Sequence, residues 1–172
     1  MILLLTLLAC PKPAPDPDSA LVTEAPPPPI PPAGTFTEGT FLDVDLPFTV
    51  RVPDGWLPRV GNSPDALRVS LTDFVTGVRV EVWAFHEGPL QPRPRAGCTW
   101  TFEDTARYRA LKVTGDILVA TCTPDDPDGP RVLGYYLAHD GVSYHLESVI
   151  PEGRLLSGKA AADRIVGTLR YR

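Results

Sequence analysis

A proline-dense segment near the start of the chain limits most strongly what that part can form. Residues 11–32 hold ten of the chain's 21 prolines. Proline fixes φ and has no backbone N–H, so helix and sheet are both excluded there. Such a segment adopts extended polyproline II, and at about 3.1 Å per residue it reaches roughly 70 Å. We expect a stand-off spacer, and a ligand for a proline-binding groove is the alternative.

An apolar run precedes the prolines and ends in a cysteine. Residues 2–8 are apolar except for Thr6, and the run is far shorter than the roughly 20 residues of a membrane-spanning helix. It fits the short end of a signal-peptide hydrophobic region. Leu7-Leu8-Ala9-Cys10 resembles the lipobox that lipoprotein signal peptidase reads. We expect cleavage before Cys10, which then carries diacylglycerol on its thiol and a further acyl chain, such as palmitate, on its amine.

The expected signal divides the chain into three parts. Residues 1–9 are the signal peptide, 10–34 the lipidated cysteine with its proline-rich linker, and 35–172 one folded domain. No Lys or Arg precedes the apolar run, so the signal is minimal or the chain begins upstream of Met1. Two or three acyl chains anchor a protein stably. We therefore expect an exported protein of the cell envelope, lipid-anchored at the outer membrane or cell surface.

The net charge of the chain limits the classes of partner that it can bind. Of the net charge of −5, the linker carries −2, from Lys12 against Asp16, Asp18 and Glu24, which leaves −3 for the domain. A mildly acidic domain with scattered charges excludes nucleic acid as a partner and gives no attraction to anionic lipid beyond the anchor. The expected partners are the membrane, through the lipid, and an unidentified protein of the cell envelope.

The domain is rich in segments whose apolar and polar residues alternate as β-strands require. Asp140-Gly141 between two such runs is the strongest short-range hairpin signal. A second hairpin is expected across Thr76-Gly77, its core face formed by Leu67, Val69 and Leu71 against Val80, Val82 and Ala84. Strands are predicted at 48–52, 67–72, 78–84, 117–123, 131–139 and 142–150.

The end of the chain changes to helical spacing, with Ser157 as the expected N-cap. The apolar positions are Leu155, Leu156, Ala162, Ile165, Val166 and Leu169. The predicted fold class is α+β: an antiparallel β-sheet with a C-terminal helix packed on it and a covering segment on the other face. Residues 99–112 fit either a short helix or a strand at 108–113 that pairs with 117–122.

Three stretches carry a family resemblance. Phe48–Trp56, Leu71–Phe74 and Ala161–Val166 resemble the PsbP-like (Mog-type) α/β/α sandwich of secreted bacterial lipoproteins, over residues 36–170. The resemblance implies a binding or assembly module rather than an enzyme. It supplies no catalytic residues.

Two cysteines remain after Cys10, and an even pair in an exported domain predicts a disulfide between Cys98 and Cys122. Closing this loop stabilises by roughly 3.5 kcal/mol in the chain-entropy model. If 117–123 pairs with 131–137, Cys122 lies on the face opposite Val119, where residues around Cys98 and Trp100 are expected to cover the sheet. A redox or metal site needs CxxC or clustered histidines, and neither pattern is present.

The histidines and carboxylates give no predicted metal, cofactor or catalytic site. His139 and His145 flank Asp140-Gly141 on opposite sheet faces, and His86 is expected to be an exposed strand-end residue. The spacing of Asp125, Asp126 and Asp128 in the acidic loop does not match that of a calcium-binding loop, so we expect a solvent-exposed loop. Asp43 and Asp45 share a strand face, which favours a wet sheet edge over acid–base chemistry. No nucleophile motif or phosphate-binding glycine loop is found in the sequence.

Aromatic residues gather on the second face of the predicted sheet: Trp83, Phe85, Trp100, Phe102 and Tyr136. They form either core beneath a covering helix or a ligand groove at Trp83, Phe85, Trp100 and Tyr136. The leading hypothesis is a lipid-anchored binding or scaffold module for a protein partner. The alternative is a carrier of a small apolar ligand between sheet and covering segment, and an unrecognised enzyme comes third. An apolar cavity beside Trp83 and Tyr136 would favour carriage, and a buried His–carboxylate cluster in one cleft would favour catalysis.

Overall fold

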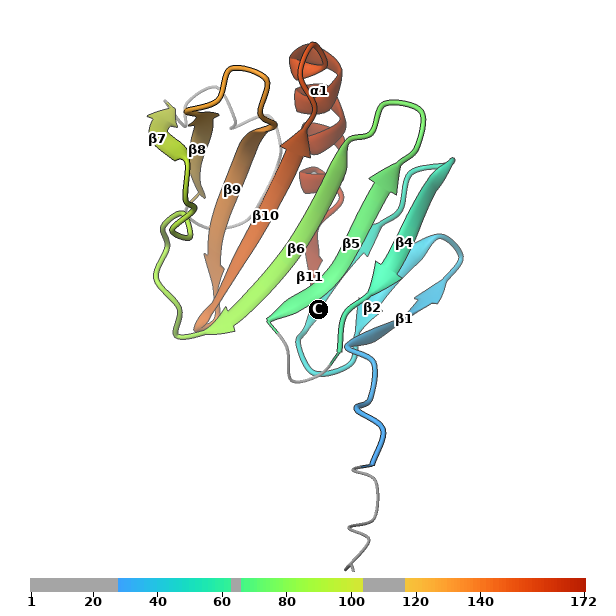
Figure 1. The fold of residues 1–172 in the computed structure, drawn as a ribbon. Helices are drawn as coiled ribbons and strands as arrows, with labels where there is room; N and C mark the ends of the chain where they lie inside the picture. The colour runs from blue at the N-terminus through green and yellow to red at the C-terminus, as the bar shows by residue number, and fades with distance from the viewer. Residues whose placement is uncertain (1–27, 63–65, 104–116) are drawn as a thin grey trace, which may run out of the picture.

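The computed structural model describes residues 28–62, 66–103 and 117–172, and Figure 1 shows their arrangement. A seven-stranded antiparallel sheet dominates it, with strand order β4-β5-β6-β10-β9-β8-β7. The strands are β4 (Trp56–Val60), β5 (Leu67–Asp73), β6 (Arg79–His86), β7 (Cys98–Glu103), β8 (Ile117–Pro124), β9 (Arg131–His139) and β10 (Val142–Ile150).

A small second sheet covers part of the first one, with strand order β1-β2-β3-β11. Of its strands, the sequence predicted the one over 48–52 and a strand that carries Asp43 and Asp45, but β2 ends at Asp43 and Asp45 lies outside it. The strands are β1 (Gly34–Thr37), β2 (Thr40–Asp43), β3 (Phe48–Arg51) and β11 (Arg170–Tyr171). The chain joins the fold at Pro32, which forms a β-bridge with Asn62, and at the fully buried Ala33.

One helix, α1 (Leu155–Val166), packs on β10, β9 and β3. The predicted fold class, an antiparallel sheet with the C-terminal helix on one face and a covering segment on the other, is confirmed. Ser157 is not the N-cap, because the helix begins earlier, after Arg154, and the Ser157 hydroxyl donates to the Arg154 carbonyl at 3.0 Å. Among the described residues, no helix is long and apolar enough to cross a bilayer.

The core lies between the large sheet on one side and α1 with the small sheet on the other. Phe48 of β3 meets Tyr144 of β10 edge to face, with ring centroids 5.2 Å apart, which joins the two sheets. Ile165 of α1 is fully buried in the same cluster. We call the core-facing side of the large sheet the inner face and the opposite side the outer face.

The predicted hairpins are present, and one of them carries an irregularity. Asp140 and Gly141 both have positive φ (46° and 75°), as the two-residue turn between β9 and β10 requires. Between β5 and β6, Val69 and Leu71 lie in the core as expected, but the register shifts between Leu67 and Val69. This β-bulge turns Leu67 away from the core, so the expectation that it belongs to the core face was wrong.

The ambiguous segment begins as a strand. Residues 98–103 form β7, which pairs with β8 at the edge of the large sheet and extends it rather than covering it. The alternative strand at 108–113 lies outside the described residues.

Candidate functional site

The aromatic residues singled out in the sequence share the outer face. In the register, His145 of β10 stands between Trp83 of β6 and Tyr136 of β9. Phe85 lies 4.8 Å from the His145 ring, centroid to centroid, and Tyr136 lies 4.9 Å from it on the other side. Trp100 of β7 continues the row, its ring edge-on to Tyr136 at 6.3 Å. Tyr136 is fully buried, so the middle of this row is packed interior.

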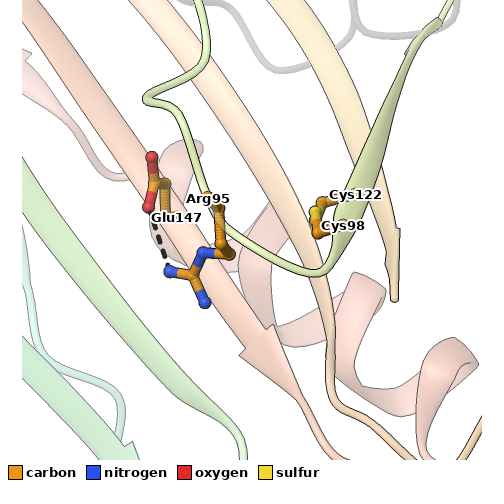
Figure 2. Close-up of a disulfide and its surroundings, with 4 residues drawn as sticks. All are labelled: Arg95, Cys98, Cys122 and Glu147. Atoms are coloured by element: carbon orange, nitrogen blue, oxygen red, sulfur yellow. Dashed lines mark ion pairs between the residues drawn. A yellow bond between two sulfur atoms is a disulfide. The ribbon is translucent and has the colours of Figure 1, made fainter. Parts of the chain in front are cut away.

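Residues 88–97, which we call the strap, cover this row, and they are not helical. Arg93 reaches down to Glu147 of β10 with two hydrogen bonds, at 3.1 and 2.5 Å. The same guanidinium lies 3.7 Å from the centroid of the Trp83 ring. Arg95 adds an ion pair to Glu147 at 3.6 Å (Figure 2). These contacts fasten an irregular segment onto the sheet.

Glu147 is the site residue that the sequence reasoning missed. Its side chain is 1% exposed, and it is charge-paired with both strap arginines. The available signal was its position two residues after His145 on the alternating strand, together with the two arginines of the proline-rich stretch at 89–95. A buried carboxylate needs paired charges, and in the described part of the chain the strap supplies them through Arg93 and Arg95.

The surroundings of His145 favour its neutral ring. Its Nε2 lies 3.2 Å from the Pro89 carbonyl oxygen of the strap. Burial lowers the pKa of His145, although the Pro89 carbonyl and the charge of Glu147 oppose that effect. Tyr136 is likewise neutral, because burial, followed by the charge of Glu147, raises its pKa.

These groups do not form a catalytic cleft. His145 and Glu147 are 2% and 1% exposed, beneath the strap, and Glu147 is engaged by Arg93 and Arg95. In the described part of the chain, no group of three or more His, Cys, Asp or Glu residues is placed to hold a metal ion. His139 lies away from this row, stacked on Tyr171 with ring centroids 3.9 Å apart.

A disulfide joins Cys98 and Cys122, as the even pair of cysteines predicted, with a Cα–Cα distance of 5.7 Å. Cys98 follows the strap directly and Cys122 lies in β8, so the bond secures the end of the strap to the sheet (Figure 2). The cover that was expected from residues around Cys98 and Trp100 comes from the strap instead.

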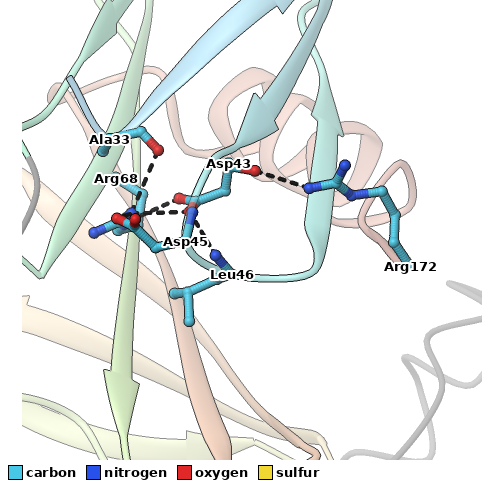
Figure 3. A network of polar contacts seen from close by, with 6 residues as sticks. All are labelled: Ala33, Asp43, Asp45, Leu46, Arg68 and Arg172. Carbon is cyan, nitrogen blue, oxygen red and sulfur yellow. Dashed lines mark hydrogen bonds and ion pairs between the residues drawn. The ribbon is translucent and has the colours of Figure 1, made fainter. Parts of the chain in front are cut away.

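Asp43 is buried in an ion-pair network rather than placed at a wet sheet edge, whereas Asp45 joins the same network from the surface, with its side chain 47% exposed. The bulge in β5 directs Arg68 inward, where its guanidinium bonds Asp43 at 2.6 and 2.8 Å and Asp45 at 2.7 Å (Figure 3). Arg68 also donates to the Ala33 carbonyl, and Asp43 accepts the backbone N–H of Leu46. The network fastens the first strands to the large sheet, so its role is structural.

Two short segments at one end of the molecule expose four of the large apolar side chains, and the other exposed ones (Ile30, Phe36, Val44, Leu57 and Phe102) belong to other segments. Phe74 and Val75, in the turn between β5 and β6, are 69% and 89% exposed, and Leu155 and Leu156, which open α1, are 40% and 86% exposed. Both segments lie at the upper end in Figure 1. We call these four residues the apolar tip. The expectation that Leu155 and Leu156 belong to the buried helix face was wrong, because they precede the turns of α1 that pack on the sheet.

The turn that carries Phe74 and Val75 is built by its own hydrogen bonds. Asp73 accepts the Val75 N–H at 3.0 Å and the Thr76 hydroxyl at 2.7 Å. The bond from Thr76, above all, lowers the pKa of Asp73. Gly77 follows with φ at 72°. The two apolar side chains are thus displayed on an ordered turn.

One loop at the end of the molecule that carries the apolar tip is acidic. The β8–β9 loop carries Asp125, Asp126 and Asp128, all exposed, and lies at the same end in Figure 1. Glu152 and Arg154, both exposed, stand just ahead of Leu155. The first described residues leave the fold at the opposite, lower end (Figure 1).

Comparison with known proteins gives similarities to solved structures. No protein-family model matches the chain, and no curated protein matches it. The fold is similar to the solution structure of cyanobacterial PsbP (CyanoP) from Synechocystis sp. PCC 6803, with a TM-score of 0.49 and 12% sequence identity. The match covers 77% of this chain and 91% of that chain.

Proposed function

We propose that this chain is an exported, lipid-anchored binding or scaffold module of the PsbP-like (Mog-type) class that engages a protein partner of the cell envelope through its apolar tip. The observation that carries the proposal is the apolar tip, where four large apolar side chains stand exposed at one end. Large apolar side chains exposed at one end of a domain are candidates for an interaction site. The ordered turn at Asp73 reduces the entropy lost when a partner binds.

The position of the tip supports a protein rather than the membrane as its partner. The first described residues enter at the end of the fold opposite the apolar tip (Figure 1), so the tip is distal to the point where the anchored linker joins the domain. The acidic loop at Asp125–Asp128 is repelled by anionic headgroups. The same charges favour a protein surface that combines apolar residues with Lys or Arg.

The partner surface is tested by photocrosslinking in intact cells. A benzoylphenylalanine at Val75 is expected to give a discrete protein adduct, whereas one at His86, exposed at the lower end of β6, gives none. Adding Phe74→Ser and Leu156→Ser to the Val75 reporter should reduce the adduct at least tenfold. Crosslinking to lipid alone, or equal adducts at Val75 and His86, would contradict the proposal.

The anchor is tested by removing its cysteine. Cys10→Ala is expected to move the protein from the membrane fraction to the soluble periplasm or the medium, because two or three acyl chains supply stable anchoring. Fractionation followed by immunoblotting measures the change, and Cys98→Ala serves as the control that retains Cys10. Membrane association of Cys10→Ala after a high-salt wash would refute the lipid anchor.

A further inference from the structure

An open trough lies on the outer face of the large sheet, on the part that the strap leaves uncovered. Its volume is about 480 Å³, and no strap residue lines it. The neighbouring strands β4, β5 and β6 (Figure 1) supply most of its lining. Most of the lining side chains are polar: Arg59, Asn62, Ser70, Thr72, Arg79 and Glu81.

The register of the sheet brings these polar side chains together. Ser70 of β5 stands between Arg59 of β4 and Glu81 of β6. Thr72, two residues along β5, stands next to Arg79. The residues that alternate with them in β5 and β6 are buried in the core. The polar set therefore forms one continuous patch on the outer face.

The trough carries a guanidinium that has no counter-charge. Arg59 is exposed, and its side chain takes part in no ion pair or hydrogen bond in the described part of the chain. The other guanidinium, that of Arg79, bonds the Glu81 carboxylate at 3.0 Å, and this carboxylate also accepts the Trp83 indole N–H at 3.3 Å. Two arginines against one glutamate leave the trough positive. A free guanidinium bonds a carboxylate with two parallel N–H donors.

The floor of the trough offers hydroxyl groups rather than backbone groups. β5 pairs with β4 on one side and with β6 on the other, so its backbone N–H and C=O groups are used within the sheet. An extended peptide that adds to a sheet needs such groups at a free edge, which disfavours a peptide here. The hydroxyls of Ser70 and Thr72 are half-buried, and neither bonds another described residue. A hydroxyl both donates and accepts, which suits a ligand that carries hydroxyl groups of its own.

We propose that this trough binds an acidic saccharide, whose carboxylate pairs with Arg59 and whose hydroxyls bond Ser70 and Thr72. No residue of the apolar tip lines the trough. The inference therefore goes beyond the proposed partner binding and does not depend on it.

The test compares three probes on the purified full chain. Digalacturonate, an acidic disaccharide, is expected to bind saturably and to shift the amide resonances of Arg59, Ser70 and Thr72 in an NMR titration. Its dimethyl ester keeps the ring hydroxyls but loses the charges, so its Kd should be about fivefold higher, the upper range for an exposed charge pair. Inorganic phosphate carries charge without sugar hydroxyls and should also bind more weakly than digalacturonate. Absence of saturable binding, equal Kd values for digalacturonate and its ester, or phosphate binding as tight as digalacturonate would each overturn the proposal.

A matched pair of arginine variants assigns the charge effect to the trough. Arg59→Gln removes the free guanidinium, so the preference for digalacturonate over its ester should disappear. Arg164→Gln changes the net charge equally at an exposed residue of α1, the helix on the inner side of the sheet, and should retain the preference. A preference that persists in Arg59→Gln, or that both variants lose, would refute the pairing with Arg59.

A third variant examines the hydroxyl floor. Thr72→Val keeps the branched shape of the side chain and removes the hydroxyl, so it should weaken digalacturonate and its ester by the same factor. Unchanged binding of both saccharides would refute the role of this hydroxyl. Circular dichroism checks that each variant is folded.

Discussion

Asp43→Ala is expected to lower the free energy of unfolding by about 3 kcal/mol, the low end of the cost of breaking a buried ion pair. The Asp43 side chain is fully buried and bonds the Arg68 guanidinium at 2.6 and 2.8 Å. Its removal leaves that guanidinium buried without its closest counter-charge. It also removes the acceptor for the N–H groups of Asp45 and Leu46. Urea denaturation followed by circular dichroism measures the loss.

The neighbouring carboxylate is the matched control for Asp43. The Asp45 side chain is 47% exposed although it also bonds Arg68, so Asp45→Ala should cost about 1 kcal/mol or less. Asp43→Asn keeps an acceptor for the turn and separates the charge effect from the turn effect. Equal losses for Asp43→Ala and Asp45→Ala would show that burial does not set the strength of this network.

The second large effect concerns the disulfide. Replacing both Cys98 and Cys122 by alanine is expected to lower the free energy of unfolding by about 3.5 kcal/mol, because the bond closes a loop with a sequence separation of 24 residues. Reduction of the unmodified protein should produce a similar loss. Amides of the strap should then exchange hydrogen faster, since Cys98 holds the end of the strap to β8.

Two measurements check this assignment. Alkylation of the non-reduced protein should find no free thiol at Cys98 or Cys122. The double alanine variant should be insensitive to a reducing agent, which makes it the control for the unmodified chain. Labelling of both cysteines without reduction, or equal stability with and without reductant, would contradict the prediction.

The sequence predicted those parts of the fold that depend on neighbouring residues. Asp140-Gly141 sets a hairpin by itself, because a two-residue turn with positive φ at both positions fixes the register of the strands beside it. The register between β9 and β10 placed His139 and His145 on opposite faces of the sheet. The register between β8 and β9 placed Cys122 on its face. Period-two patterning also identified β5 and β6.

The parts that were missed depend on residues far apart in the chain. No turn residue in the sequence indicates the bulge at Leu67, yet the bulge places Leu67 and Arg68 on the faces opposite to those that simple alternation predicts. Asp43 meets Arg68 across 25 residues, and Arg93 meets Glu147 across 54. Such pairs become evident only once the sheets are assembled.

The sequence predicted which residues form the candidate site but not that they are covered and buried. Alternation placed Trp83, Phe85 and Tyr136 on one face, but the burial of that face depends on the strap, whose proline-rich sequence predicts no regular structure. Leu155 and Leu156 of the apolar tip were expected to be buried and are exposed. Helical spacing identifies the apolar face of a helix but does not show which end of the helix extends past the sheet.

The proline in β4 bears on how copies of this protein would share a membrane. β4 is an edge strand of the large sheet, paired on one side with β5, and Pro58 lies in its middle. Lipid anchoring would confine such domains to two dimensions, where neighbours collide often. A proline removes a backbone donor from the edge, and Arg59 beside it adds charge. Copies would therefore be poor templates for one another's sheets, which keeps a crowded layer of them from polymerising laterally.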